Sequence, residues 1–199
     1  MWNERYGKPG YAYGTEPNDF LASVASEIPK GKVLCIGEGE GRNAVYLASL
    51  GHEVTAVDQS PVGLAKAREL AAQRGVTIHT VVADLADFVI EPASYQAIVS
   101  IFCHLPTELW TRVNKAAVAG LAPGGVYVLE AYTPDQLLLK TGGPREVERL
   151  LSLQKAKDTL TGIRWKIARE IERTVNEGEY HHGRAAVVQL FGEVQRQDS

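Results

Sequence analysis

The sequence predicts an α/β protein built on a doubly wound, mostly parallel seven-stranded sheet with an antiparallel hairpin at its C-terminal end. Three observations support this fold class. Strand-like runs alternate with amphipathic, helix-like runs from residue 32 to residue 131, as in βαβ units with right-handed crossovers. Two β-rich runs flank a polar, glycine-bounded connection after residue 160. The length of 199 residues, of which 45% are hydrophobic, suits a single domain over residues 1–199.

The expected elements follow one another in a regular order. Five short apolar or β-branched runs are predicted as strands, at residues 32–36, 53–57, 77–82, 95–102 and 126–131. Three amphipathic runs are predicted as helices, at residues 42–50, 60–74 and 107–120. Ser60 and Pro61 suit the N-cap and the first position of the second helix. Gly51 and Gly75 suit the positions that end the first two helices with a positive φ.

The C-terminal third gives a mixed signal. Ile163, Trp165 and Ile167 alternate as in a strand, although Ile163, Ile167, Ile171 and Val175 also recur with a helical period. We predict a strand, because the polar connection "NEGEYHHG" and the β-rich run "AAVVQLFGEV" follow and would complete a hairpin. Residues 134–160 read as a loop and then a helix, which either covers an active site or presents a solvated charged face.

Charge and cysteine content limit the classes of partner. A net charge of −3 gives no basic field for nucleic acid or for an anionic membrane, and no run approaches the roughly 18 apolar residues of a membrane span. Cys35 and Cys103 lie in apolar runs and are expected to be buried thiols, too few for a disulfide framework or a zinc site. We therefore expect a cytoplasmic protein, monomeric or dimeric, that acts on small molecules and holds no metal.

A glycine-rich loop follows the first predicted strand, in the stretch "VLCIGEGEGRNAVYLASLGHEVTAVDQSP". Gly37, Gly39 and Gly41 allow the backbone to approach a ligand closely. Asp58 ends the second strand, 21 residues after Gly37, where its carboxylate can accept hydrogen bonds from both hydroxyls of a ribose. The pair predicts a nucleoside ligand.

Two nucleosides fit this loop. Gly39, Gly41 and Ala44 satisfy the G-x-G-x-x-A pattern of NAD-binding proteins. However, Glu38 and Glu40 place two carboxylates where a pyrophosphate would lie, and like charges ~4 Å apart in a partly buried site cost several kcal/mol. The sulfonium and ammonium of S-adenosylmethionine are cationic, so the acids favour that ligand.

The chain up to about Ala131 resembles the class I S-adenosylmethionine-dependent methyltransferases, and "WNERY" with "GEGRNAVYLA" is similar to their small tellurite-resistance-like and thiopurine-like branch. The motifs "ADL" and "LAPGG" also match the family pattern. The resemblance implies a Rossmann-like methyltransferase fold, an N-terminal segment (1–31) that covers the cofactor, a cofactor-binding core (32–132), and a substrate-side helix and edge hairpin (133–199).

The glycine loop and this resemblance together predict the cofactor contacts. Asp84 with Leu85 would read the adenine, although Asp84 also suits a turn or helix cap. Many relatives carry an acid at the position of Cys35, and Glu38 or Glu40 could replace it. The predicted cofactor-binding residues are Gly37, Glu38, Gly39, Gly41, Asp58, Gln59, Ala83, Asp84, Leu85, Ile101, Trp2 and Tyr13.

The catalytic residues are less sharply indicated. Methyl transfer to a soft nucleophile depends mainly on in-line orientation, so a general base is not required. His104, after the fourth strand, is the best-placed base, with simple packing at the sheet edge as the alternative. His181 and His182 would point to opposite faces of a strand and so would not share a metal, and we expect both on an exposed turn rather than against a substrate. Arg42 and Asn43 are expected to support the helix that follows the loop. The N-terminal aromatic residues are expected to pack onto the domain, either by plain packing or near the sulfonium.

The resulting prediction is transfer of a methyl group from S-adenosylmethionine to a small-molecule acceptor such as a thiol, a metalloid or another soft nucleophile. The alternatives are an NAD(P)-dependent oxidoreductase and a non-catalytic nucleoside-binding module.

Overall fold

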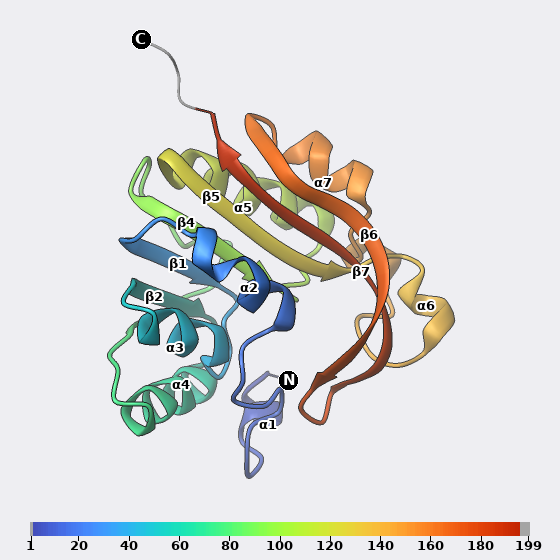
Figure 1. Cartoon of the computed structure of the whole chain (residues 1–199). Helices are drawn as coiled ribbons and strands as arrows, with labels where there is room; N and C mark the ends of the chain where they lie inside the picture. The colour runs from blue at the N-terminus through green and yellow to red at the C-terminus, as the bar shows by residue number, and fades with distance from the viewer. Residues whose placement is uncertain (1, 196–199) are drawn as a thin grey trace.

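A computed structural model describes residues 2–195 of the chain and shows one seven-stranded sheet (Figure 1). The strand order is β3-β2-β1-β4-β5-β7-β6, with the first five strands parallel and β7 antiparallel to both neighbours. This arrangement confirms the predicted fold class. The strands are β1 (Lys32–Ile36), β2 (Glu53–Asp58), β3 (His79–Val82), β4 (Tyr95–Ile101), β5 (Leu121–Tyr132), β6 (Ile163–Glu177) and β7 (His181–Val194).

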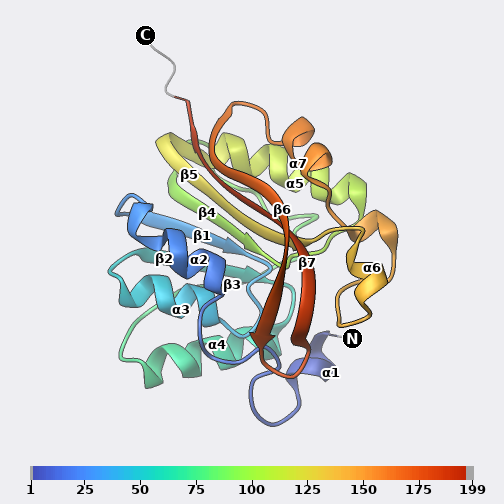
Figure 2. The same ribbon diagram turned by 45° about the vertical axis from the view of Figure 1, so that its right-hand side comes forward.

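Helices cover both faces of the sheet, as Figures 1 and 2 show. One face packs against α2, α3 and α4, and the other against α5 and α7. The α-helices are α1 (Trp2–Tyr6), α2 (Asp19–Val24), α3 (Arg42–Ser49), α4 (Pro61–Gln73), α5 (Thr107–Gly120), α6 (Gln136–Leu139) and α7 (Leu153–Thr159). Two short 3-10 helices lie at Ala25–Glu27 and Val147–Arg149.

The strand β1 shows why two helical layers form. Its side chains alternate, so that Val33 and Cys35 join the core under α3 and α4, while Leu34 and Ile36 join the core under α5. All four residues are almost completely buried. A strand that is apolar on both faces is stable only between two covering layers, which is the arrangement of buried parallel sheets.

Local signals set most of the helix ends. Ser60 caps α4 by accepting a hydrogen bond from the Gly63 N–H, and Pro61 is its first residue. Gly51 and Gly75 follow α3 and α4 with φ of +88° and +68°, as predicted.

Several boundaries differ from the prediction. Strand β5 begins at Leu121 instead of residue 126, because "LAPGG" forms an irregular start to the strand where the pairing register with β4 shifts. β3 begins at His79 instead of residue 77. Residues 134–160 hold short helices instead of a loop and one helix, and α1 and α2 are not among the elements that the sequence pattern predicts.

The hairpin β6–β7 is longer than the rest of the sheet. Its strands pair over their whole length, from Ile163 opposite Val194 to Glu177 opposite His181. The far end leaves the sheet, curves past α6 and approaches α1, as both views show. The free end of the hairpin therefore lies beside the N-terminal segment, at the carboxyl edge of the parallel strands. Within residues 2–195, no helix is long and apolar enough to cross a lipid bilayer.

Candidate active site

The glycine loop lies where the strand order reverses, between β1 and β4, which is the position at which doubly wound sheets bind ligands. Gly37, Gly39 and Gly41 all have positive φ, at +64°, +61° and +88°. A Cβ at Gly37 would lie 2.5 Å from the Cys103 sulfur, and one at Gly39 would lie 2.5 Å from the Tyr6 hydroxyl. The loop thus needs glycine both for its conformation and for the close approach of its neighbours.

Asp58 is buried at the end of β2 and faces this loop. Its Oδ2 accepts a hydrogen bond from the Gly39 N–H and its Oδ1 accepts one from the Ser60 N–H. Burial raises the pKa of its carboxyl group, against the lowering effect of these two hydrogen bonds. Because each carboxylate oxygen has two lone-pair sites, Asp58 can still accept hydrogen bonds from a ligand.

Glu38 lies in the loop before α3, and its side chain reaches the N-terminus of that helix. Its carboxylate accepts hydrogen bonds from the N–H groups of Asn43 and Ala44, in the first turn of the helix. Burial raises the pKa of Glu38 to about 7, although the two N–H donors and Arg42 oppose the shift. Phosphate groups bind proteins at such helix N-termini. Since Glu38 already uses these donors, the loop offers them to no diphosphate.

Glu40 does not face the ligand side, contrary to the expectation that both acids act there. Its carboxylate accepts hydrogen bonds from the Ala12 N–H and from the Lys66 ammonium, and the residue is 4% exposed. Glu40 therefore ties the N-terminal segment to the loop. The same Lys66 donates to the carbonyl groups of Lys8 and Gly10.

The loop after β3 carries the predicted adenine contacts. The Ala83 N–H donates to the Asp58 carbonyl, which joins the ends of β2 and β3. The exposed Asp84 accepts a hydrogen bond from the Ala86 N–H, so it forms a turn and keeps free lone pairs. Gln59 is exposed beside Asp58, and Ile101 is buried at the end of β4. The structure brings all the predicted cofactor residues of this core to one edge, and their binding roles stay predictions.

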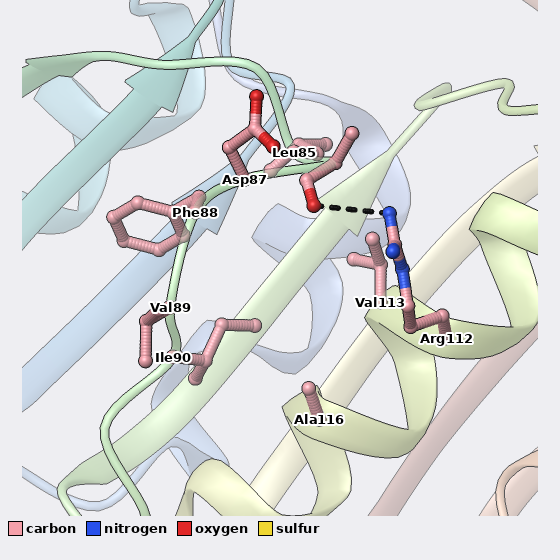
Figure 3. A pocket seen from close by; sticks show the side chains of 9 residues that line it. Leu85, Asp87, Phe88, Val89, Ile90, Arg112, Val113 and Ala116 are labelled. Atoms are coloured by element: carbon pink, nitrogen blue, oxygen red, sulfur yellow. Dashed lines mark hydrogen bonds between the residues drawn. The ribbon is translucent and has the colours of Figure 1, made fainter.

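A hollow of about 150 Å³ lies beside Leu85, between residues 85–90 and α5 (Figure 3). Arg112 on α5 closes one side by donating a hydrogen bond to the Ala86 carbonyl. Leu85, one of the predicted adenine contacts, lines this hollow, whereas Asp58 and Asp84 do not.

The N-terminal segment, defined here as residues 2–18, covers the glycine loop. Trp2 stacks on Tyr6, and the Tyr6 side chain is buried against Gly39 and Gly63. Burial and the neighbouring Asp58 raise the pKa of Tyr6. Tyr13 accepts a hydrogen bond from Arg5. The predicted packing of these aromatic residues is confirmed, while contact of Trp2 and Tyr13 with a cofactor stays a prediction.

A buried ionic cluster, which no sequence pattern predicts, holds the segment to the hairpin. Glu130, fully buried on β5, accepts hydrogen bonds from Asn18, Arg173 and Gln189. Glu177 on β6 also accepts from Asn18 and Arg173.

Arg42 and Asn43 attach α3 to the same cluster, and so do more than support their own helix. Arg42 pairs with Glu177, and the Asn43 side chain accepts a hydrogen bond from the Asn18 N–H. Burial raises the pKa of Glu177, but the neighbouring His181 and the bonds to Arg42 and Arg173 lower it more, to about 2. The sequence indicates this cluster only through charged residues within β-rich runs, such as Glu130 in "VLEAY".

His104 lies on the loop after β4 and stacks on Tyr132 with a ring-centroid distance of 5.4 Å. Its Nδ1 lies 3.1 Å from the Arg149 carbonyl oxygen. Because a carbonyl only accepts, Nδ1 carries the proton and Nε2 of the neutral ring has a free lone pair. Nε2 is buried and has no hydrogen-bond partner. Burial lowers the pKa of His104 to about 4, so the ring is neutral at pH 7.

His181 is buried, which corrects the prediction of an exposed turn for both histidines. The turn of the hairpin is shorter than predicted, so His181 already belongs to β7 and its ring contacts Tyr13 and Phe102, with centroid distances of 4.4 Å and 4.6 Å. His182 points the other way and is exposed, as strand alternation requires.

Comparison with known proteins agrees with this architecture. Residues 33–125 match a family model described as a methyltransferase domain. The 2-heptyl-1-hydroxyquinolin-4(1H)-one methyltransferase of Mycobacteroides abscessus is 30% identical over 136 residues, which are 64% of this chain and 60% of that protein. The chain spans between 52% and 61% of the first three curated relatives it matches.

Solved structures share the fold. TehB from Haemophilus influenzae superposes with a TM-score of 0.74 and 20% identity over 98% of this chain and 66% of that one. An S-adenosylmethionine-dependent methyltransferase from Clostridium acetobutylicum gives a TM-score of 0.68 and 13% identity over 89% and 90% of the two chains. The strand order and the position of the glycine loop give this chain a Rossmann-like α/β fold that these solved structures share. The match to the methyltransferase family model covers residues 33–125.

Proposed function

We propose that the protein transfers a methyl group from S-adenosylmethionine to a small-molecule acceptor that reacts through sulfur, oxygen or another soft nucleophilic atom. The observation that carries the proposal is the pair of carboxylates at the glycine loop. Glu38 takes the helix donors that a diphosphate would need, while Asp58 keeps lone pairs that suit ribose hydroxyls. This combination favours a cationic sulfur nucleoside over NAD.

Each side of the loop has a role in this proposal. Gly37 and Gly39 allow the cofactor to approach the backbone, Asp58 accepts hydrogen bonds from the ribose, and Asp84 with Leu85 meets the adenine. Gln59, Ala83 and Ile101 border the same space. Tyr6, Trp2 and Tyr13 exclude water from it. When bound, the cofactor supplies a methyl group activated by its positively charged sulfur.

His104 supplies the proton acceptor. Its Nε2 lone pair takes the proton of an acceptor hydroxyl or thiol as the bond between the acceptor atom and the methyl carbon forms. The bound cofactor would give up its methyl group and keep the electron pair of the broken carbon–sulfur bond on sulfur, so atoms and charge would balance. The hydrogen bond to the Arg149 carbonyl fixes the tautomer that this role requires.

Two finer assignments accompany the proposal. We favour the tellurite-resistance-like and thiopurine-like branch of the class, because the N-terminal "WNERY" segment covers the glycine loop and TehB shares the fold. We also favour a cytoplasmic location, in keeping with two free thiols, of which Cys35 is completely buried.

Calorimetric titration with S-adenosylhomocysteine and, in parallel, with NADH tests the proposal. We expect S-adenosylhomocysteine to bind and NADH to fail, because only the first lacks a diphosphate. Binding of NADH alone would overturn the proposal. Binding of S-adenosylhomocysteine without methyl transfer to any thiol, phenol or metalloid would instead favour a non-catalytic module.

A further inference from the structure

The turn Val147–Arg149 contacts the loop that carries His104. The Arg149 carbonyl oxygen lies 3.1 Å from His104 Nδ1, and the Arg149 guanidinium donates a hydrogen bond to the His104 carbonyl oxygen. None of the three side chains in residues 147–149 is buried, and Val147 is 61% exposed. Because packing does not fix this turn, its position depends on hydrogen bonds from outside it.

One end of the turn is anchored to the sheet. Leu150 and Leu151 follow the turn and are each 2% exposed. The Leu151 N–H donates a hydrogen bond of 2.9 Å to the Tyr132 carbonyl oxygen at the end of β5. In contrast, residues 145–148 are all exposed. The turn therefore needs a second anchor on its N-terminal side.

Two side chains from neighbouring helices supply this second anchor. Thr107, the first residue of α5, donates a hydrogen bond of 2.9 Å from its hydroxyl to the Glu148 carbonyl oxygen. Lys155 on α7 donates to the same carbonyl oxygen at 3.3 Å and to the Thr107 hydroxyl at 2.9 Å. A closed triangle of hydrogen bonds thus joins Thr107, Glu148 and Lys155, and we name it the brace.

The Lys155 ammonium is held in place on two sides. Its Nζ lies 5.9 Å from the centroid of the buried Trp110 ring, within the range of a cation–π interaction. Burial lowers the pKa of Lys155, against the raising effect of the Glu148 carboxylate. Hydrogen bonds from a charged donor are stronger than those between neutral groups. The brace therefore fixes the Glu148 carbonyl more firmly than the Thr107 hydroxyl alone would.

The position of the turn decides which nitrogen of His104 carries the proton. A neutral imidazole has one N–H, and a carbonyl acceptor beside Nδ1 selects the Nδ1–H tautomer. Stacking on Tyr132, at an interplanar angle of 11°, sets the plane of the ring but does not distinguish its two nitrogens. If the Arg149 carbonyl moved away, the proton would also occupy Nε2, and the lone pair that accepts a proton there would be lost.

We propose that Thr107 and Lys155 are positioning residues for His104. By holding the Glu148 carbonyl, they keep the next carbonyl, that of Arg149, against Nδ1 and leave Nε2 free to accept a proton. This inference rests on the proposed function, in which His104 is the proton acceptor, and it adds the two residues that maintain its reactive tautomer.

NMR spectroscopy of protein labelled with ¹⁵N-histidine tests the proposal without any methyl acceptor. In the parent protein, we expect His104 to carry its proton on Nδ1. Thr107→Val removes the hydroxyl at nearly constant shape and should raise the ratio of the Nε2–H to the Nδ1–H tautomer about tenfold, as expected for loss of one hydrogen bond. Hydrogen exchange at the Leu150 N–H, which donates within the turn, should become faster by a similar factor.

Matched variants separate the brace from general effects on the two helices. Lys155→Met should change the tautomer ratio in the same direction as Thr107→Val. Thr107→Ser, which keeps a hydroxyl, should restore the ratio of the parent protein. Lys157→Met, on the exposed side of the same α7, should leave the ratio unchanged. Denaturant unfolding shows that each variant is folded before its spectrum is compared.

Three results would overturn the proposal. They are an unchanged tautomer ratio in both Thr107→Val and Lys155→Met, an equal change in Lys157→Met, and a lack of recovery in Thr107→Ser. Calorimetry with S-adenosylhomocysteine keeps this test apart from the proposed function. We expect the affinity to stay within about twofold of the parent value in every variant, because the brace lies outside the glycine loop. Failure of the parent protein to bind this compound would overturn the proposed function instead.

Discussion

The two sides of the candidate site are built in different ways. At the ends of β1 and β2, backbone groups shape the site, through three glycines with positive φ and the N–H groups that Asp58 and Glu38 bind. On the hairpin side, side chains shape it, through the contacting rings of Tyr13, Tyr132 and His181 and through buried hydrogen bonds and ion pairs between residues up to 159 positions apart. The side proposed for the cofactor is thus encoded locally and the side proposed for the acceptor by long-range contacts, and the two sides should respond differently to substitution.

The largest expected effect is on stability, from Glu130→Ala on the acceptor side. The change removes one of the two buried acids to which Arg173 and Asn18 both donate, and loss of one partner from a buried ion pair typically costs about 3–5 kcal/mol. Denaturant unfolding measures this free energy. The control is Glu27→Ala, whose ion pair with Lys166 is exposed and is worth at most about 1 kcal/mol. Similar losses for the two variants would show that the ionic cluster does not hold the acceptor side.

The next effect is on ligand affinity, from Asp58→Ala on the cofactor side. Loss of hydrogen bonds to a charged acceptor should weaken S-adenosylhomocysteine binding by about 30-fold, or about 2 kcal/mol. Calorimetry measures the affinity. The exposed Asp87 serves as the control, since Asp87→Ala should leave the affinity unchanged. An unaltered affinity in the Asp58 variant would contradict its assignment to the ribose.

The pH dependence of stability should also separate the two sides. The pKa of Glu38 is raised to about 7. Its contribution to the free energy of unfolding is therefore complete below about pH 4.5 and is lost as the pH rises through 7. The pKa of His104 is lowered to about 4. Its contribution to the free energy of unfolding is therefore complete above about pH 6.5 and is lost as the pH falls through 4. The two contributions oppose each other between pH 4.5 and pH 6.5.

Single variants should reveal these opposing terms. Glu38→Gln keeps an acceptor for the α3 N–H groups and should make stability fall more steeply from pH 7 to pH 5, whereas His104→Asn should make it fall less steeply. Each difference should reach on the order of 2 kcal/mol in denaturant unfolding across that range. If the pH profiles of both variants ran parallel to that of the parent protein, neither group would have a shifted pKa in the folded state.

The smallest expected effect concerns the contact between the N-terminal segment and the loop. In Gly63→Ala, the new Cβ would lie 2.9 Å from the Tyr6 ring, which should displace the segment and increase its cleavage by protease. The strain should offset the gain of about 1 kcal/mol that alanine usually gives within a helix. In the double variant with Tyr6→Ala, the substitution at Gly63 should cost less, although the new Cβ still lies 3.0 Å from the Gly39 carbonyl oxygen. Identical effects with and without the Tyr6 ring would rule out this contact.

Residues with local partners were predictable from the sequence. Gly51, Gly75, Ser60 and Pro61 each act within a few positions of themselves, so their patterns fix helix ends in any context. The position of Asp58 at the end of β2 follows from the spacing of the βαβ unit. These features explain why the fold class and the edge with the glycine loop agree with the prediction.

Residues with distant partners were not predictable. Glu40 reads as a loop acid, yet its partners are Ala12 and Lys66. His181 reads as part of a polar turn, yet the hairpin folds it against Tyr13 of the N-terminal segment. No local pattern indicates such pairings, because the sheet topology brings these segments together only when the whole domain has folded.

The attachment of Asn18 to Glu130 and Glu177 has a consequence during translation. The ribosome releases Asn18 early and Glu130 emerges with β5, but Glu177 emerges only with the hairpin, 159 positions after Asn18. β1 to β5 can therefore pair in a nascent polypeptide before the hairpin completes the anchor of the N-terminal segment.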